Sequence, residues 1–137
     1  MRIICFDYGE KRIGVAVSDL RSILASGTKT LTVRGFSHAV ELAAEEIKQQ
    51  GAERIVVGLP KNMNGSEAAS AEKARKFGVS VAEKSGVEVV YFDERMTTMQ
   101  AHKYLNQTEY FGKKRKAVID TLSAQIILQD YLDSLRK

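Results

Sequence analysis

The sequence of 137 residues is poor in cysteine and proline, with one of each, and it has no hydrophobic run that approaches the length of a membrane span. Cys5 alone cannot close an intramolecular disulfide or form a cysteine zinc site, which excludes the disulfide-stapled secreted domains and fits a reducing cytosol. The apolar stretch before Asp7 is four residues long, too short for a signal peptide. We therefore expect a cytoplasmic protein without a membrane anchor. His38 and His102 lack paired ligand spacing, so a histidine zinc site is not expected.

The composition is that of an ordinary globular domain, with 44% hydrophobic and 28% charged residues. A length close to the usual domain size of roughly 150 residues predicts a single domain spanning 1–137. The net charge of +4 is unevenly placed, because residues 101–116 hold five basic and one acidic side chain, whereas residues 1–100 hold 14 and 13. The excess lies in the run Lys113, Lys114, Arg115 and Lys116. Such a run suits contact with a polyanion, although a solvated helix face is the common alternative.

Hydrophobic periodicity predicts strands in the first part of the chain and alternating strands and helices after it. Residues 12–19 alternate branched apolar residues with Gly14, Ala16 and Ser18, so one face of this strand can lie close to another backbone. Residues 54–59 and 87–92 are short continuous apolar runs, typical of strands buried on both faces. The predicted strands are 2–6, 12–19, 23–33, 54–59 and 87–92, and the predicted helices are 37–50, 67–84, a short one from Thr97, and 114–135.

This order of elements predicts an α/β fold, a mixed sheet with helices on both faces. A hairpin opens the chain, and right-handed crossovers join the later strands, so the carboxyl ends of the parallel strands gather at one edge. Ligands of open α/β sheets bind at that edge. The same edge is therefore the expected position of a functional site.

Acidic residues follow the most apolar elements, with Asp7 after the first strand and Asp93 and Glu94 after the last. A carboxylate at such a position costs desolvation energy unless it is paired, and a divalent cation such as Mg²⁺ holds several carboxylates together. Side chains alternate along a strand, so only one of Asp93 and Glu94 can face the side of Asp7. We favour Glu94 as the ligand and leave Asp93 as the alternative.

Asp120 is a third acid, within the predicted C-terminal helix. It shares a helix face with Ala124 and Ile127, which indicates that it points toward the sheet rather than to water. The alternative is that Asp120 lies in the first turn of the helix and interacts with the helix dipole.

Polar and basic side chains near these acids are candidates for phosphate binding. Asn62 and Asn64 precede a predicted helix, whose N–H groups together with the amide side chains can receive a phosphate; a simple capped helix explains them equally well. Lys11 and Arg12 follow the Asp-x-Gly turn. They are either phosphate ligands or solvated residues at the end of a hairpin. The expected nucleic-acid contacts are Lys11, Arg12, Asn62, Asn64, Arg95, Lys113, Lys114, Arg115 and Lys116.

Four ordered segments together resemble the YqgF family, which groups pre-16S rRNA nucleases and Holliday junction resolvases. The resemblance covers essentially the whole chain, and its segments are Asp7 to Asp19, Val57 to Gly65, Asp93 to Thr98, and Val118 to Leu132 around Asp120. It implies a ribonuclease H-like fold, a cytoplasmic location and a role in maturing the 5′ end of 16S rRNA. It further implies that Asp7, Glu94 (or Asp93) and Asp120 bind Mg²⁺ or Mn²⁺ and hydrolyse phosphodiester bonds by a two-metal mechanism.

Other functions share these residues. A Holliday junction resolvase would use the same chemistry on DNA, and the symmetry of its substrate would favour a homodimer, whereas RNA trimming suits a monomer as well. A noncatalytic RNA-binding or assembly module would keep the fold without cleavage. An ATPase of the actin type needs two Asp-x-Gly hairpins, whereas this sequence contains a single Asp-x-Gly motif, which argues against such an ATPase. We therefore expect a nuclease acting on structured RNA, with a DNA junction as the alternative substrate.

Overall fold

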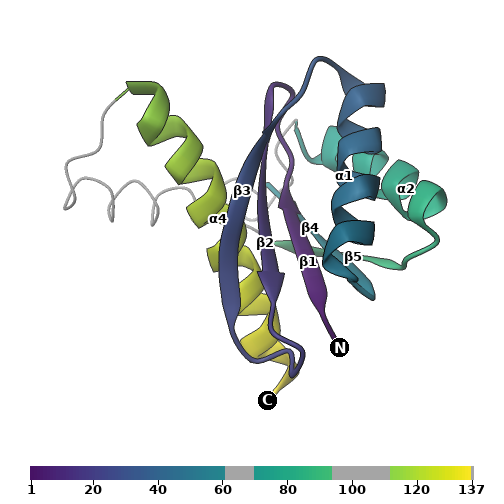
Figure 1. Ribbon diagram of the computed structural model, residues 1–137, viewed down its shortest axis with the longest axis vertical. Helices are drawn as coiled ribbons and strands as arrows, with labels where there is room; N and C mark the ends of the chain where they lie inside the picture. The colour runs from purple at the N-terminus through teal and green to yellow at the C-terminus, as the bar shows by residue number, and fades with distance from the viewer. Residues whose placement is uncertain (61–69, 94–111, 137) are drawn as a thin grey trace.

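The computed structural model describes residues 1–60, 70–93 and 112–136, the last range with its side chains from Ile119 onward. Five strands form one sheet in the order β3-β2-β1-β4-β5 (Figure 1). The first three strands pair antiparallel, whereas β4 is parallel to both β1 and β5. The elements are β1 (Ile3–Asp7), β2 (Arg12–Ser18), β3 (Ala25–Thr32), α1 (Phe36–Gln50), β4 (Arg54–Leu59), α2 (Ala71–Ser85), β5 (Val89–Asp93) and α4 (Gly112–Leu135).

Helices cover both faces of the sheet, as the sequence predicts. Figure 1 shows α1 and α2 side by side on one face and α4 on the other. The alternation within β1 separates the two cores: Ile4 and Phe6 pack under α1 and α2, while Ile3 and Cys5 pack under α4. The predicted mixed α/β sheet is confirmed, and Cys5 is a buried core residue.

The helices end where local chemistry stops them. Gly51 follows α1 in the left-handed conformation with φ of 64°, and its N–H donates to the carbonyl of Lys48. Glycine adopts this conformation without the strain that a Cβ atom causes, so the predicted end of the helix at Gly51 is confirmed. Ser70 precedes α2. The expected start of that helix at 67 and the short helix from Thr97 fall outside the described residues.

The two apolar runs expected to be fully buried strands behave differently. β4 lies inside the sheet between β1 and β5, and its residues 55–59 are buried. The prediction for 87–92 is wrong, because β5 is the last strand of the sheet and its residues are only partly buried. An edge strand pairs on one side alone, and apolar composition does not distinguish it from an interior strand. β5 therefore brings Asp93 to an open corner of the sheet.

α4 packs across the N-terminal hairpin and β1, although it is the last element of the chain. Its residues Ala124, Leu128 and Leu132 are fully buried against Ala16 and Val56, among others. Because this face of the sheet has small side chains on β2, the helix approaches the strands closely. None of the helices that the structure describes is long and apolar enough to span a membrane.

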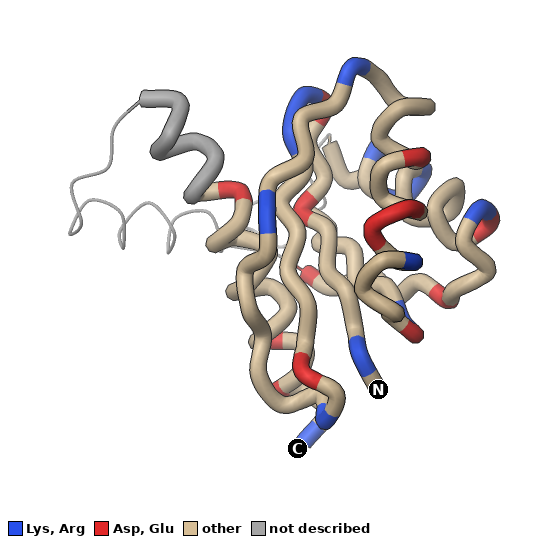
Figure 2. Tube along the Cα trace, in the orientation of Figure 1, with Lys and Arg blue, Asp and Glu red and all other residues tan. Residues whose placement is uncertain are grey.

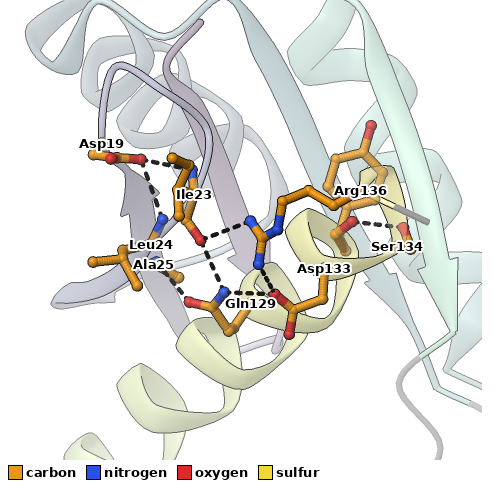
Figure 3. Close-up of polar contacts among 9 residues, drawn as sticks. Asp19, Ile23, Leu24, Ala25, Gln129, Asp133, Ser134 and Arg136 are labelled. Carbon is orange, nitrogen blue, oxygen red and sulfur yellow. Dashed lines mark hydrogen bonds and ion pairs between the residues drawn. The ribbon is translucent and has the colours of Figure 1, made fainter.

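Polar contacts attach the C-terminal half of α4 to the loop between β2 and β3 (Figure 3). The side-chain amide of Gln129 accepts the N–H of Ala25 at 2.9 Å and donates to the carbonyl of Ile23 at 3.0 Å. The side-chain amide thus satisfies one backbone N–H and one backbone carbonyl at the end of this loop. Asp19 holds the same loop by accepting the N–H of Ile23 at 2.7 Å, a hydrogen bond that keeps the pKa of Asp19 below its ordinary value. The orientation of α4 is therefore set by specific hydrogen bonds as well as by apolar packing.

We expect Gln129→Ala to lower the free energy of unfolding by about 1–3 kcal/mol, since a typical hydrogen bond contributes about 0.5–1.5 kcal/mol net. Urea denaturation followed by circular dichroism measures this loss. The matched control is Gln49→Ala on the exposed face of α1, where the amide donates to Glu45 at 3.3 Å. That variant should change stability by less than about 0.5 kcal/mol. Equal effects of the two substitutions would contradict the role of Gln129.

Candidate functional site

Asp7 ends β1 on the face of the sheet that α4 covers. Side chains alternate along a strand, and Ile3 and Cys5, four and two positions earlier, both pack under α4. Asp7 is paired with Gly14 of β2 in the antiparallel register. Residues paired in this way point to the same side, with Cα atoms about 5 Å apart. The residue next to Asp7 on this face of the sheet is therefore a glycine, Gly14, which has no side chain.

The backbone of α4 occupies the space above Gly14. A Cβ atom added to Gly14 would lie 1.9 Å from the carbonyl oxygen of Asp120 and 3.2 Å from its Cα atom. No side chain can fit in that gap, so helix and strand approach each other here more closely than any other residue type would permit. Asp7 and Asp120, from the first strand and the last helix, are thus both immediate neighbours of Gly14.

Arg12 connects β2 to the same acid. Its Nε atom donates to Oδ2 of Asp120 at 2.7 Å, across 108 residues of sequence. The side chains of Arg12 and Asp120 are 38% and 21% exposed, so water screens the pair and its contribution to stability is modest. The pair also places the positive charge of Arg12 between β2 and α4, beside the carboxylate of Asp120.

The position of Asp120 excludes its alternative interpretation. α4 begins at Gly112, so Asp120 lies more than two turns inside the helix, beyond the reach of the dipole at the helix N-terminus. The neighbours expected to share its face, Ala124 and Ile127, are buried against the sheet. The prediction that Asp120 points toward the sheet is confirmed.

Asp93, the last residue of β5, can be assigned to a face of the sheet. Val90 and Phe92 pack in the core under α4, while Val89 and Tyr91 pack in the core under α1 and α2. By alternation Asp93, which is exposed, has the parity of Val89 and Tyr91 and belongs to the face opposite Asp120. Glu94 lies outside the described residues.

Basic residues surround the same end of the sheet. Figure 2 shows Lys and Arg positions on the β1–β2 and β3–α1 turns, which contain Lys11 and Arg34. Lys11 is exposed, as a phosphate ligand would be. Lys113, Lys114, Arg115 and Lys116 lie in the first two turns of α4, with their side chains outside the described part. Asn62, Asn64 and Arg95 also fall outside it.

Oxygen ligands dominate this site. Asp7 and Asp120 supply carboxylate oxygens, the donors that Mg²⁺ and Mn²⁺ prefer, so the chemistry of the donor set fits such an ion. Among the residues that the structure describes, no three acidic, histidine or cysteine side chains lie close enough to hold a metal ion. Glu94, the third acid expected from the sequence, is not among those residues. His38 accepts the N–H of Arg34 at 3.0 Å, which gives it a local structural role.

Sequence reasoning missed two features of this site. It noted the small residues of 12–19 without placing Asp120 over Gly14, and it assigned Arg12 to phosphate binding rather than to Asp120. The alternation of glycine and alanine was the available signal for the first. No local pattern signals an ion pair between residues 108 positions apart.

Comparison with known proteins agrees with this geometry. The sequence model of the RuvX family, described as Holliday junction resolvase, matches residues 1–134. A protein of Caldanaerobacter subterraneus named "Putative pre-16S rRNA nuclease" is 47% identical over 98% of this chain and 97% of its own length. A protein of the same name from Clostridioides difficile is 45% identical over 96% of this chain and 94% of its own length.

Solved structures share the fold at much lower identity. Thermus thermophilus RuvC in complex with a Holliday junction substrate has a TM-score of 0.62 at 14% identity, over 99% of this chain and 96% of that one. The Fowlpox virus resolvase in complex with Holliday junction DNA has a TM-score of 0.63 at 15% identity, over the full length of both chains. This likeness shows that the fold is ribonuclease H-like, as the sequence resemblance implied.

We expect Gly14→Ala to cost at least about 2 kcal/mol of stability, because the new methyl group meets the helix backbone and α4 has to shift. Gly27→Ala is the matched control on β3 beneath the same helix. There the nearest atom to an added Cβ is the side-chain methyl of Thr121 at 2.7 Å, which can move. Chemical denaturation of both variants measures the difference. If Gly14→Ala were no more destabilising than Gly27→Ala, the close approach at Asp120 would be refuted.

Proposed function

Because the chain belongs to the RuvX (YqgF) family, we propose that it is a nuclease that hydrolyses a phosphodiester bond of precursor 16S rRNA. The reaction takes place at the sheet edge where Asp7 and Asp120 meet. The observation that supports this proposal most directly is that Asp7 and Asp120, which are far apart in the sequence, are both neighbours of Gly14. The protein acts in the cytoplasm as one domain, in monomeric or homodimeric form.

Asp7, Glu94 and Asp120 are the proposed ligands of Mg²⁺ or Mn²⁺. When bound, such ions activate water and stabilise the negative charge that develops on the leaving oxygen. Two of these acids already share the face of the sheet under α4. The parity of β5 favours Glu94 as the third, because it follows Val90 and Phe92 in the alternation that faces α4. Asp93 has the opposite parity and is the less suitable ligand.

Arg12 holds Asp120 in place and keeps positive charge beside the acids. A guanidinium carries five N–H donors, and the ion pair with Asp120 uses one. The same side chain is therefore suited to contact a phosphate oxygen of the substrate, which reconciles its observed partner with its predicted role. Nucleic acid is further bound by the exposed Lys11 and by Asn62, Asn64, Arg95, Lys113, Lys114, Arg115 and Lys116.

A DNA junction is the second candidate substrate, since the family whose model matches is described as Holliday junction resolvase. Cleavage assays with purified protein and Mn²⁺ on precursor 16S rRNA and on a four-way DNA junction distinguish the two. Cleavage near the 5′ end of the mature rRNA sequence, with an intact junction, supports the RNA substrate. Symmetric nicking of the junction with intact RNA supports the resolvase. Cleavage of neither substrate, with RNA still bound, supports an assembly module.

We expect Asp7→Asn, Asp120→Asn and Glu94→Gln each to lower the cleavage rate at least about 100-fold, since even outer-shell partners of a metal contribute about 10–100-fold. RNA affinity should remain within about threefold, because the side chains that bind phosphate are unchanged. Single-turnover cleavage and filter binding measure the two quantities.

Asp93→Asn provides the matched control for Glu94→Gln, since it removes the neighbouring charge from the opposite face of β5. It should retain most of the activity. A loss in Asp93→Asn with full activity in Glu94→Gln would exchange the roles of the two residues, and full activity of Asp7→Asn would refute the proposed centre.

Replacing Lys113, Lys114, Arg115 and Lys116 with glutamine should weaken RNA binding and flatten its salt dependence. For each phosphate that the protein no longer neutralises, the slope of log affinity against log salt concentration falls by about 0.7–0.9. The single-turnover rate at saturating RNA should stay close to wild type, because the acids are untouched. An unchanged slope would show that the basic run does not contact the substrate.

A further inference from the structure

A cavity of about 370 Å³ lies beyond the end of β1, on the opposite face of the sheet from α4. It is lined by Tyr8, Glu10, Gly35, Phe36, Lys73 and Lys76, which come from the end of β1 and the beginnings of α1 and α2. This volume is at the lower end of the range of about 300–1,000 Å³ found for small-ligand sites. The cavity is thus suited to one group of nucleotide size, and it is too small for a helix or a duplex.

Aromatic rings line this cavity. Tyr8 stacks on the buried ring of Phe77 with centroids 4.6 Å apart and planes inclined by 28°, so its ring is held rigidly. Phe36, the first residue of α1, is 43% exposed although it is a large apolar side chain. Burial raises the pKa of Tyr8, so its hydroxyl stays protonated at neutral pH and can donate a hydrogen bond. The cavity therefore combines a fixed aromatic wall with a ring that is open to a planar ligand.

The charge around the cavity is positive. Lys73 pairs with Glu10, and this pairing, together with the charge of Lys11, holds the pKa of Glu10 below its ordinary value. Lys76 is exposed and makes no ion pair with any residue in the described parts of the chain. The cavity lining thus contains two lysines and one glutamate. An anionic ligand fits this balance.

Resting on the function proposed above, we infer that this cavity binds one unstacked nucleotide of a single-stranded segment of the substrate, next to the cleaved phosphate. The base stacks on Phe36, and its phosphate contacts Lys76 and Lys73. A base within a duplex is already stacked on both sides, whereas a single-stranded base offers its face to an aromatic ring. Tyr8 directly follows Asp7 in the chain, so the cavity and the acids lie at the same end of β1, on its two faces.

The test is binding of a fluorescently labelled single-stranded RNA of about ten nucleotides to the full-length protein without divalent metal, measured by anisotropy. Phe36→Ala should weaken binding about fivefold or more, the lower limit for loss of one base–aromatic stack, and Phe36→Tyr should restore it. Lys76→Gln should reduce the salt slope by about 0.7, the value for one phosphate of a single strand.

Matched controls remove comparable side chains that do not line the cavity. Lys48→Gln removes a charge from the last turn of α1, and Leu24→Ala removes a 64% exposed apolar side chain from the β2–β3 loop. Both should bind as wild type does, and equal melting temperatures should show that every variant folds. Unlabelled adenosine monophosphate should compete far less effectively than the unlabelled oligonucleotide.

Wild-type affinity of Phe36→Ala, or an unchanged salt slope of Lys76→Gln, would overturn the inference. Competition by the mononucleotide as effective as that by the strand would also overturn it, in favour of a free nucleotide. Because these measurements use no metal, they are independent of cleavage. Loss of binding in Phe36→Ala together with an inactive wild-type protein would refute the nuclease and leave the single-strand site standing.

Discussion

The candidate site depends on the contact between the backbone of α4 and Gly14. A strand and a helix can lie this close only where the strand has no side chain, and the carbonyl of Asp120 occupies the position that a Cβ atom would take. Ala16 continues the same small face of β2 under the helix. The hydrophobic core beneath α4 sets the distance of the helix from the sheet, and the amide of Gln129 sets its direction by binding the β2–β3 loop. Asp7 and Asp120 are neighbours because both constraints act together.

The two faces of the sheet carry different groups of side chains at their common end. The face under α4 brings together the acids and Arg12, whereas the face under α1 and α2 presents an aromatic and basic cavity. Asp7 and Tyr8 are consecutive residues at the end of β1, so the end of this one β-strand contributes a residue to each of the two groups. The proposed catalytic acids and the proposed single-strand site are thereby held in a fixed relative position by the sheet.

Much of the fold could be predicted from the sequence because its signals are local. An apolar, β-branched run predicted β1 and apolar alternation predicted β2. Gly51 predicted the end of α1, and the small residues from Gly14 predicted a close neighbour. The burial of β5 was predicted wrongly, since position at the edge of a sheet depends on pairing and not on composition. For the site, the face of Asp120 followed from helical periodicity, whereas its ion pair with Arg12 and the exposure of Phe36 depend on tertiary contacts between distant residues.

The joining of the first strand to the last helix has a consequence for synthesis of the protein. Domains form as the chain leaves the ribosome, and the N-terminal elements emerge first. The hairpin of β1 and β2 and the parallel pair of β1 and β4 need none of the last residues, whereas Asp120 reaches Gly14 only after α4 has emerged. A nascent chain therefore holds Asp7 in its strand before Asp120 has been added beside it. The acidic pair is therefore assembled only after α4 has left the ribosome and packed on the sheet.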